Sequence, residues 1–217
     1  MAEKIVILGA GGQARVVASI LAYNSNFEVV GYLDRVATTI GEKIGIYTVI
    51  GDHSLLPNLL SNGISYTFVA VGDNQIRAEH FKMLNHAGFQ LANLIHPTAF
   101  IEQDVVYGRG NLFAARSVVG THVVLGDNCI INTGAIIDHE SLIGSHVHVA
   151  PGVSIAGRVK INDYSFIGIG ATVKEYVTIG ENVTVGAGAV VLGNLPDNVT
   201  AIGIPARIIK KKDQSID

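Results

Sequence analysis

Residues 131–149 read INTGAIIDHESLIGSHVHV, and every sixth position in this stretch is apolar. These positions are Ile131, Ile137, Ile143 and Val149. The same rule holds without a break from Ile95 to Val191, and a small residue such as Ala135 or Ser141 often stands two positions earlier. A period of six fits neither the 3.6-residue turn of an α-helix nor the two-residue alternation of a strand. It is typical of a hexapeptide parallel β-helix.

The β-helix is expected to occupy residues 95–196. Three hexads form one triangular coil in solenoids of this kind, so residues 18 apart should stack on one another. Each coil contacts only its neighbours, which makes the array quasi-one-dimensional. The remaining segment, 197–217, contains the apolar and turn-rich run Gly203-Ile204-Pro205-Ala206 and is expected to fold back on the solenoid end.

Residues 1–94 lack the six-residue period and are expected to form a small Rossmann-like domain. Strands are predicted at 4–8, 28–33 and 66–71, and helices at 13–22, 53–60 and 75–86. The Gly-containing stretch that ends at Gly51 is expected to be irregular. Strands that alternate with helices predict a parallel α/β sheet. The chain is therefore predicted to combine an α/β domain with an all-β solenoid.

Composition excludes several classes of protein. The chain has 217 residues, 48% hydrophobic and 15% charged, but no apolar run reaches the roughly 20 residues of a membrane-spanning helix. A formal net charge of −3 gives no reason to expect a nucleic-acid partner. A single cysteine, Cys129, rules out an internal disulfide and favours a reducing compartment. The N-terminus shows no secretory signal, so a cytoplasmic location is expected.

The first candidate site is the motif Gly9-x-Gly11-x-x-Ala14 between a strand and a helix. The N–H groups of such a turn favour a phosphate, and an acidic residue about 20 positions later, here Asp34, suits a ribose hydroxyl. About 94 residues are too few for both halves of a dinucleotide fold. We therefore favour a nucleotide diphosphate such as that of a nucleotide sugar, while a dinucleotide and a turn with only a packing role stay open.

The second candidate site is Asp138-His139-Glu140, at an expected corner of the solenoid. Alternation breaks at a corner, so the side chains of His139 and Glu140 can point to the same side. An imidazole oriented by a carboxylate is suited to act as a general base near neutral pH. Gly157, 18 residues on, should stack above His139, where its N–H suits an oxyanion. The alternatives are a corner histidine and a corner glycine without a role.

A third possibility is zinc chemistry, because some solenoids of this type are zinc carbonic anhydrases. Such a site needs three imidazoles that converge between subunits. The histidines available in the solenoid are His122, His139, His146 and His148. Their spacing does not favour convergence, so no metal is expected.

Taken together, these motifs resemble the bacterial nucleotide-amino-sugar N-acetyltransferases of the NeuD/PglD type, with the related sialic-acid O-acetyltransferases. The resemblance covers nearly the whole chain. It rests on the turn 9–12, Asp34, Val71-Gly72-Asp73-Asn74 with Arg77, Asn93-Leu94-Ile95-His96-Pro97, Ile131-Asn132-Thr133, His139-Glu140 and Gly203-Ile204-Pro205-Ala206. The hexads alone indicate only the acyltransferase superfamily, whereas the small domain before an uninterrupted solenoid is more specific.

The resemblance implies a left-handed β-helix, a homotrimer and acetyl-CoA bound as cosubstrate in the groove between adjacent solenoids. It implies that the nucleotide of the acceptor is bound through Gly11, Gly12, Gln13, Asp34 and Arg35. It assigns His139 as general base, Glu140 as the residue that raises its basicity, and Asn132 to the acceptor amine. It places His148, Gly157, Ile169 and Ala187 at acetyl-CoA. The family often has His at the position of Gln13 and Asp at that of Arg35, so the base and the sugar stay open.

The predicted function is therefore transfer of an acetyl group from acetyl-CoA to the amine of a nucleotide-linked 4-amino-4,6-dideoxysugar, with UDP, GDP or dTDP as the nucleotide, in the biosynthesis of bacterial surface glycans. Three alternatives remain. They are O-acetylation of a sialic acid or similar sugar, a nicotinamide-dependent oxidoreductase, and a non-catalytic trimer that senses nucleotide. The nucleotide-binding domain favours the amine, because a free sugar would not need it.

Overall fold

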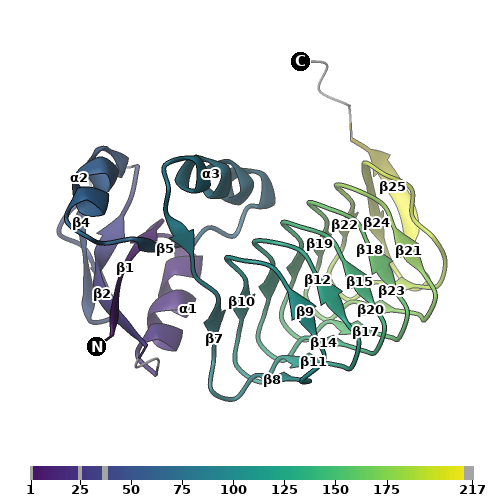
Figure 1. Cartoon of the computed structure of the whole chain (residues 1–217). Coiled ribbons are helices and arrows are strands. Elements are labelled where there is room, and N and C mark those ends of the chain that lie inside the picture. The colour runs from purple at the N-terminus through teal and green to yellow at the C-terminus, as the bar shows by residue number, and fades with distance from the viewer. Residues whose placement is uncertain (1, 24–25, 36–38, 213–217) are drawn as a thin grey trace. The chain divides into compact units, whose positions relative to one another are not determined.

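The computed structural model describes residues 2–23, 26–35 and 39–212. The chain divides between Pro97 and Thr98 into two compact units, and Figure 1 shows the elements of each. No helix within the described ranges is long and apolar enough to cross a bilayer.

The first unit is a mostly parallel sheet with helices, as predicted. Its strand order is β3-β4-β2-β1-β5-β6. The strands are β1 (Glu3–Leu8), β2 (Phe27–Leu33), β3 (Lys43–Ile44), β4 (Tyr47–Gly51), β5 (Tyr66–Val69) and β6 (Gln90–Leu91). The helices are α1 (Gly12–Leu21), the short 3-10 helix η2 (His53–Leu55), α2 (Leu56–Ser61) and α3 (Asn74–His86). The strand β7 (Leu94–Ile95) follows at the end of this unit.

The expectation that the stretch before Gly51 is irregular was wrong. The strands β3 and β4 form an antiparallel pair, and β4 also pairs with β2 in parallel, Tyr32 opposite Val49. The run Tyr47-Thr48-Val49-Ile50 consists of aromatic and β-branched residues that favour a strand. Residues 34–46 separate it from its parallel partner β2, so that pairing depends on contacts beyond the local sequence.

The loop after β5 is fixed from both sides. Asp73 caps α3, because its carboxylate accepts hydrogen bonds from the N–H groups of Gln75 and Ile76. Arg77 is fully buried and donates to the carbonyl oxygens of Val71 and Gly72. The loop after β5 is therefore held by hydrogen bonds within the chain.

The second unit is a β-helix of two-residue strands, as the six-residue period predicts. Figure 1 shows its coils stacked one on another. One sheet contains β10 (Leu112–Phe113), β13 (Ile130–Ile131), β16 (His148–Val149), β19 (Phe166–Ile167) and β22 (Thr184–Val185). A second contains β8 (Phe100–Ile101), β11 (Val118–Val119), β14 (Ile136–Ile137), β17 (Ser154–Ile155), β20 (Thr172–Val173) and β23 (Val190–Val191). The third contains β9 (Val106–Tyr107), β12 (Val124–Leu125), β15 (Leu142–Ile143), β18 (Lys160–Ile161) and β21 (Thr178–Ile179).

Stacking follows the predicted interval of 18 residues. Ile137, for example, lies opposite Ile155, which in turn lies opposite Val173. From residue 111 to residue 191, both residues that point inward in each hexad are buried, as at Ala135 and Ile137, whereas the inward residues of the first coil are partly exposed. The interior of these later coils is therefore filled with side chains.

The corners of the coils share one backbone conformation. From Gly110 to Gly188, every sixth residue has a positive φ of 52° to 70°. This left-handed conformation turns the chain from one sheet to the next. At one of the three corners the stacked residues are Gly134, Gly152, Gly170 and Gly188, whereas at another they are His122, Glu140, Arg158 and Tyr176.

The chain closes the last coil with a hairpin. The strand β24 (Val199–Ile202) pairs in parallel with β22, and β25 (Arg207–Lys211) pairs with β24 in the antiparallel direction. The ammonium group of Lys212 donates to the backbone carbonyl and the side chain of Asn182. The hairpin covers β22, which would otherwise be a sheet edge.

Candidate active site

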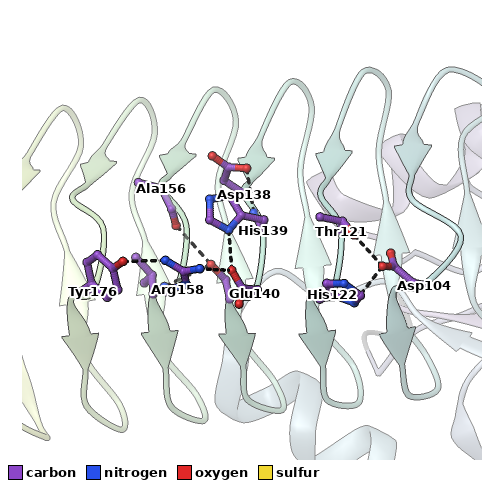
Figure 2. A network of polar contacts seen from close by, with 11 residues as sticks. Asp104, Thr121, His122, Asp138, His139, Glu140, Ala156, Arg158 and Tyr176 are labelled. Atoms are coloured by element: carbon purple, nitrogen blue, oxygen red, sulfur yellow. Dashed lines mark hydrogen bonds and ion pairs between the residues drawn. The ribbon is translucent and has the colours of Figure 1, made fainter.

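The residues Asp138, His139 and Glu140 form the corner between β14 and β15 (Figure 2). The Asp138 carboxylate accepts the backbone N–H of His139 at 2.8 Å. The Nδ1 atom of His139 lies 3.0 Å from the Glu140 Oε2 atom. Both side chains are a little over two-fifths exposed, so the pair is open to a substrate.

The protonation of the pair follows from these contacts. The hydrogen bond from the His139 ring, followed by that from Arg158, holds the pKa of Glu140 below its usual range. Glu140 is therefore an ionised carboxylate near neutral pH, and it only accepts hydrogen bonds. The Nδ1 atom of His139 must then carry the hydrogen, which leaves Nε2 of the neutral ring with a free lone pair.

Gly157 lies directly against the imidazole, as the interval of 18 predicts. The N–H of Arg158 donates to the His139 carbonyl at 2.8 Å, which joins the two coils. A methyl group on Gly157 would lie 2.5 Å from both Cε1 and Nε2 of His139. Among the described residues, the Gly157 N–H donates to no acceptor. A pocket of about 120 Å³ opens here, lined by His139, Gly157, Arg158, Glu175 and Tyr176.

Sequence analysis missed two members of this site. Arg158 donates to Glu140 Oε2 at 2.7 Å and to the Tyr176 hydroxyl at 2.6 Å. Its guanidinium carbon lies 5.6 Å from the centre of the Tyr176 ring. Both residues follow Glu140 at intervals of 18, so the rule that located Gly157 would also have found them.

The glycine turn of the first unit lies at the start of α1. Gly9 has a φ of +104°, and a side chain there would meet the Ala70 carbonyl at 2.9 Å. The Asp34 carboxylate accepts the N–H of Ala10 at 2.7 Å, so the residue predicted to bind a ribose also fixes the turn. α1 has no side-chain cap.

This turn presents several donors to a ligand. Among the described residues, the N–H groups of Gly11, Gly12 and Gln13 donate to no acceptor. The side-chain Nε2 of Gln13 is buried and also has no hydrogen-bond partner within that part of the chain. Free N–H groups at a helix N-terminus favour an anion such as a phosphate.

Two histidines that sequence analysis did not select lie close enough to Asp34 and Arg35 to be influenced by their charges. The rings of His53 and His80 contact each other edge to face, with centroids 5.0 Å apart. Burial, followed by the positive charge of Arg35, lowers the pKa of His53. Burial also lowers the pKa of His80, with His53 and Arg35 adding to the effect. Both rings are therefore expected to be neutral near pH 7.

Both units of the chain match families of known proteins. The PglD N-terminal domain family matches residues 4–84, and the bacterial transferase hexapeptide family matches residues 158–193. The GDP-perosamine N-acetyltransferase of Escherichia coli O157:H7 is 28% identical over 97% of this chain and 98% of its own length. The crystal structure of PerB from Caulobacter crescentus, in complex with CoA and GDP-perosamine, is 38% identical, with a TM-score of 0.90 over 97% of this chain and 99% of that one.

The chain belongs to the PglD-like N-acetyltransferase family. A further structure, the acetyltransferase domain of PglB from Neisseria gonorrhoeae FA1090 in complex with acetyl coenzyme A, is 37% identical, with a TM-score of 0.89 over 96% of this chain and 100% of that one. As a PglD-like enzyme, the chain is an acetyl-CoA-dependent N-acetyltransferase of nucleotide-linked amino sugars.

The other residues that the PglD-like family implies lie away from His139 in the single chain. Asn132 and His148 are buried, and the Asn132 side-chain amide lies 3.2 Å from His148 Nε2. Ile169 and Ala187 are exposed and stack at the corner where the chain passes from the sheet that contains β10 to the sheet that contains β8. His139 occupies the next corner, where the chain passes from the sheet that contains β8 to the sheet that contains β9. One chain therefore places the predicted base and the two residues predicted to bind acetyl-CoA at different corners.

The histidines named for a zinc site do not gather at one place. His122 pairs with Asp104 at 2.9 Å, His146 packs against Tyr164, and His148 packs against Phe166. Within the described ranges, no group of three or more His, Cys, Asp or Glu side chains is placed to hold a metal ion.

The fit between Gly157 and His139 yields a first prediction for the PglD-like enzyme. Gly157→Ala should lower kcat by about 10²-fold, because the new methyl group displaces the imidazole by roughly an ångström. The backbone at Gly157 has no positive φ and the clashing atoms belong to a side chain, so the variant should fold. Gly193→Ala is the matched control, since a methyl group there meets nothing within 4 Å. Steady-state kinetics of both variants measure the effect; equal kcat values would contradict the prediction.

Proposed function

We propose that the enzyme acetylates the 4-amino group of a GDP-linked 4-amino-4,6-dideoxysugar, with His139 as general base. The amine nitrogen attacks the thioester carbonyl of acetyl-CoA, the C–N bond forms, and the C–S bond breaks. The free Nε2 of His139 takes the proton from the amine and returns it to the leaving thiolate. The observation that carries the assignment is the Nδ1 hydrogen bond to the ionised Glu140, which leaves Nε2 as the acceptor.

The surroundings of His139 support this chemistry. Glu140 stabilises the imidazolium that forms during transfer, as an orienting carboxylate does in other general-base pairs. The Gly157 N–H, which has no acceptor among the described residues, is available to stabilise the oxyanion of the tetrahedral intermediate. The pocket of about 120 Å³ beside these groups is large enough for an acetyl group and too small for a whole substrate.

The glycine turn is proposed to bind the diphosphate of the acceptor. The free N–H groups of Gly11, Gly12 and Gln13 would bind phosphate oxygens, and Asp34 and Arg35 would lie near the nucleoside. The buried Gln13 amide adds a donor with no partner among the described residues. We favour GDP because relatives that match almost end to end act on or bind GDP-perosamine. Acetyl-CoA is a cytoplasmic metabolite, so we place the reaction in the cytoplasm.

We also propose a homotrimer with active sites between subunits. Its first support is the separation of His139 from Ile169 and Ala187, which lie at different corners of one chain. Two neighbouring subunits would bring one corner of each kind together. Acetyl-CoA would then lie between His139 of one subunit and Ile169 and Ala187 of the next.

The second support for a trimer is an apolar strip on the outside of the solenoid. Val106, Val124 and Leu142 stack on three successive coils, and their exposures are 63%, 42% and 48%. Phe100 and Ile136 are exposed on the neighbouring sheet, at 56% and 42%. Contiguous apolar side chains of this kind are typical of protein–protein interfaces.

The role of the first unit is tested by Asp34→Ala. The substitution leaves the Ala10 N–H without its acceptor and loosens the turn. We expect KM for the nucleotide sugar to rise about 10-fold or more, since a hydrogen bond to a charged group is lost. KM for acetyl-CoA should not change, because that cosubstrate is proposed to bind at the solenoid. A parallel rise in both KM values would instead indicate a general loss of structure.

The acceptor is identified by thiol release from acetyl-CoA with a panel of GDP-, UDP- and dTDP-linked 4-amino-4,6-dideoxysugars and free sialic acid. Turnover with the GDP-linked sugar supports the proposal. Turnover with a UDP- or dTDP-linked sugar instead would show that the proposed nucleotide is wrong and that the proposed N-acetyl transfer is right. Turnover with sialic acid alone would overturn the amine acceptor in favour of O-acetylation.

A further inference from the structure

A column of polar side chains follows one corner of the solenoid through five coils (Figure 2). Its members, each 18 residues after the last, are Asp104, His122, Glu140, Arg158 and Tyr176. Contacts along the column join His122 to Asp104 at 2.9 Å, Arg158 to Glu140 at 2.7 Å, and Arg158 to Tyr176 at 2.6 Å. Glu140 and Arg158 therefore form an ion pair in the middle of this column, and His139 joins the pair at Glu140.

Arg158 and His139 compete for the same atom. The Arg158 Nη2 and His139 Nδ1 atoms both lie within 3.0 Å of Glu140 Oε2. The other terminal nitrogen of the guanidinium, Nη1, donates to the Tyr176 hydroxyl, and the Tyr176 ring lies beside the group. Tyr176 therefore fixes the guanidinium in the plane from which it reaches the carboxylate.

We propose that Arg158, held by Tyr176, is a positioning residue for His139: it fixes the rotamer of Glu140 and limits how strongly that carboxylate favours the protonated imidazole. The inference rests on the proposed role of His139 as general base. The base has two requirements: a carboxylate must orient it, and it must give its proton back to the departing thiolate. The His139-Glu140 pair meets the first requirement, and Arg158 is inferred to help with the second by weakening the hold of Glu140 on the protonated imidazole.

The sign of the effect follows from the charges. A positive group near the pair disfavours a second positive charge on His139. Arg158 also occupies part of the hydrogen-bonding capacity of Oε2. Removal of the guanidinium should therefore favour the protonated imidazole on both counts. Since only the neutral imidazole accepts a proton, the acid limb of the rate profile should move to higher pH.

Other charged groups near His139 do not reverse this sign. Asp138 lies beside it and accepts its backbone N–H, and Glu175 lines the same pocket. Lys174 lies 3.9 Å from Glu175 and offsets part of its charge. Each of these groups is present both before and after a change at Arg158, so a difference between variants reports Arg158.

The test is the pH dependence of kcat/KM for Arg158→Gln, Arg158→Lys and Tyr176→Phe. Arg158→Gln should lower kcat about 10-fold and move the midpoint of the acid limb upward by about half a pH unit or more. Arg158→Lys keeps the positive charge but cannot contact Glu140 and Tyr176 through two separate nitrogens. The acid limb of this variant should stay near that of the native enzyme, while its kcat stays low. Tyr176→Phe keeps the ring and should give a smaller shift in the same direction.

Backbone strain is not expected to cause any difference in activity among the variants at Arg158. Arg158 has a φ of +60°, which costs an Arg, Gln or Lys side chain a similar amount. An acid limb of Arg158→Gln that is unmoved, or that moves to lower pH, overturns the inference. His139→Ala is measured in the same assay. If that variant keeps full activity, the proposed base is wrong; if it is inactive and only the shift is missing, the proposed function stands and the role of Arg158 falls.

Discussion

Replacement of His139 by alanine is expected to lower kcat by about 10²–10⁴-fold, the usual contribution of a general base. The free Nε2 of His139 is the only group of the pair that is placed to accept a proton from the amine, since Glu140 is occupied by His139 and Arg158. The side chain is partly exposed and does not fill the core, so the fold should persist. Steady-state kinetics at saturating acetyl-CoA measure the loss.

The matched control for this substitution is His122→Asn. His122 lies at the same corner one coil earlier, is 69% exposed and also contacts a carboxylate, Asp104. Asparagine tolerates the positive φ of 57° at that position. We expect the control to keep nearly full activity. Full activity of a folded His139→Ala enzyme would remove His139 from the chemistry, whatever the control does.

Two inactive variants are expected to restore activity to each other. His139→Ala lacks the base, and Ala187→Trp should block acetyl-CoA at the other corner. In a mixed trimer of the two variants, one of the three interfaces combines an intact His139 with an intact Ala187. Mixed trimers purified through two different tags should therefore show about one third of native activity per trimer.

The two homotrimeric variants, assayed at the same concentration, provide the baseline for this experiment. Size-exclusion chromatography with light scattering establishes that the mixed species contains three chains. Activity no higher than the baseline would place the whole site within one chain and would overturn the intersubunit proposal. A chain that is monomeric in solution would do the same before any mixing.

The solenoid was predictable from sequence because every coil has the same packing pattern. The apolar residue at every sixth position packs in the interior, and the interval of 18 follows because each coil contains one hexad from each of the three sheets. That interval predicts that Gly157 stacks on His139, and the structure places Gly157 against the His139 ring. The α/β unit was predictable in outline for a similar reason, since its strands and helices are strongly patterned.

The features that sequence analysis missed depend on contacts between residues and not on the six-residue period of the sequence. The strand β4 gains its place by pairing with both β2 and β3, and the aromatic and β-branched run at 47–50 was the local signal for it. Arg158 and Tyr176 were overlooked although the interval of 18 points to both. Their importance comes from side-chain geometry, the shared contact on Glu140 Oε2, which a count of residues does not contain.

The left-handed corner residues, one every six positions from Gly110 to Gly188, give the solenoid an unusual tolerance of changes in length. An insertion of 18 residues adds a whole coil and leaves every later side chain in its own column. An insertion of six rotates everything after it to the next corner, and would carry a glycine into the place of Arg158. During evolution such a scaffold can therefore grow along its axis by duplication, while the chemistry at one corner changes only by point substitution.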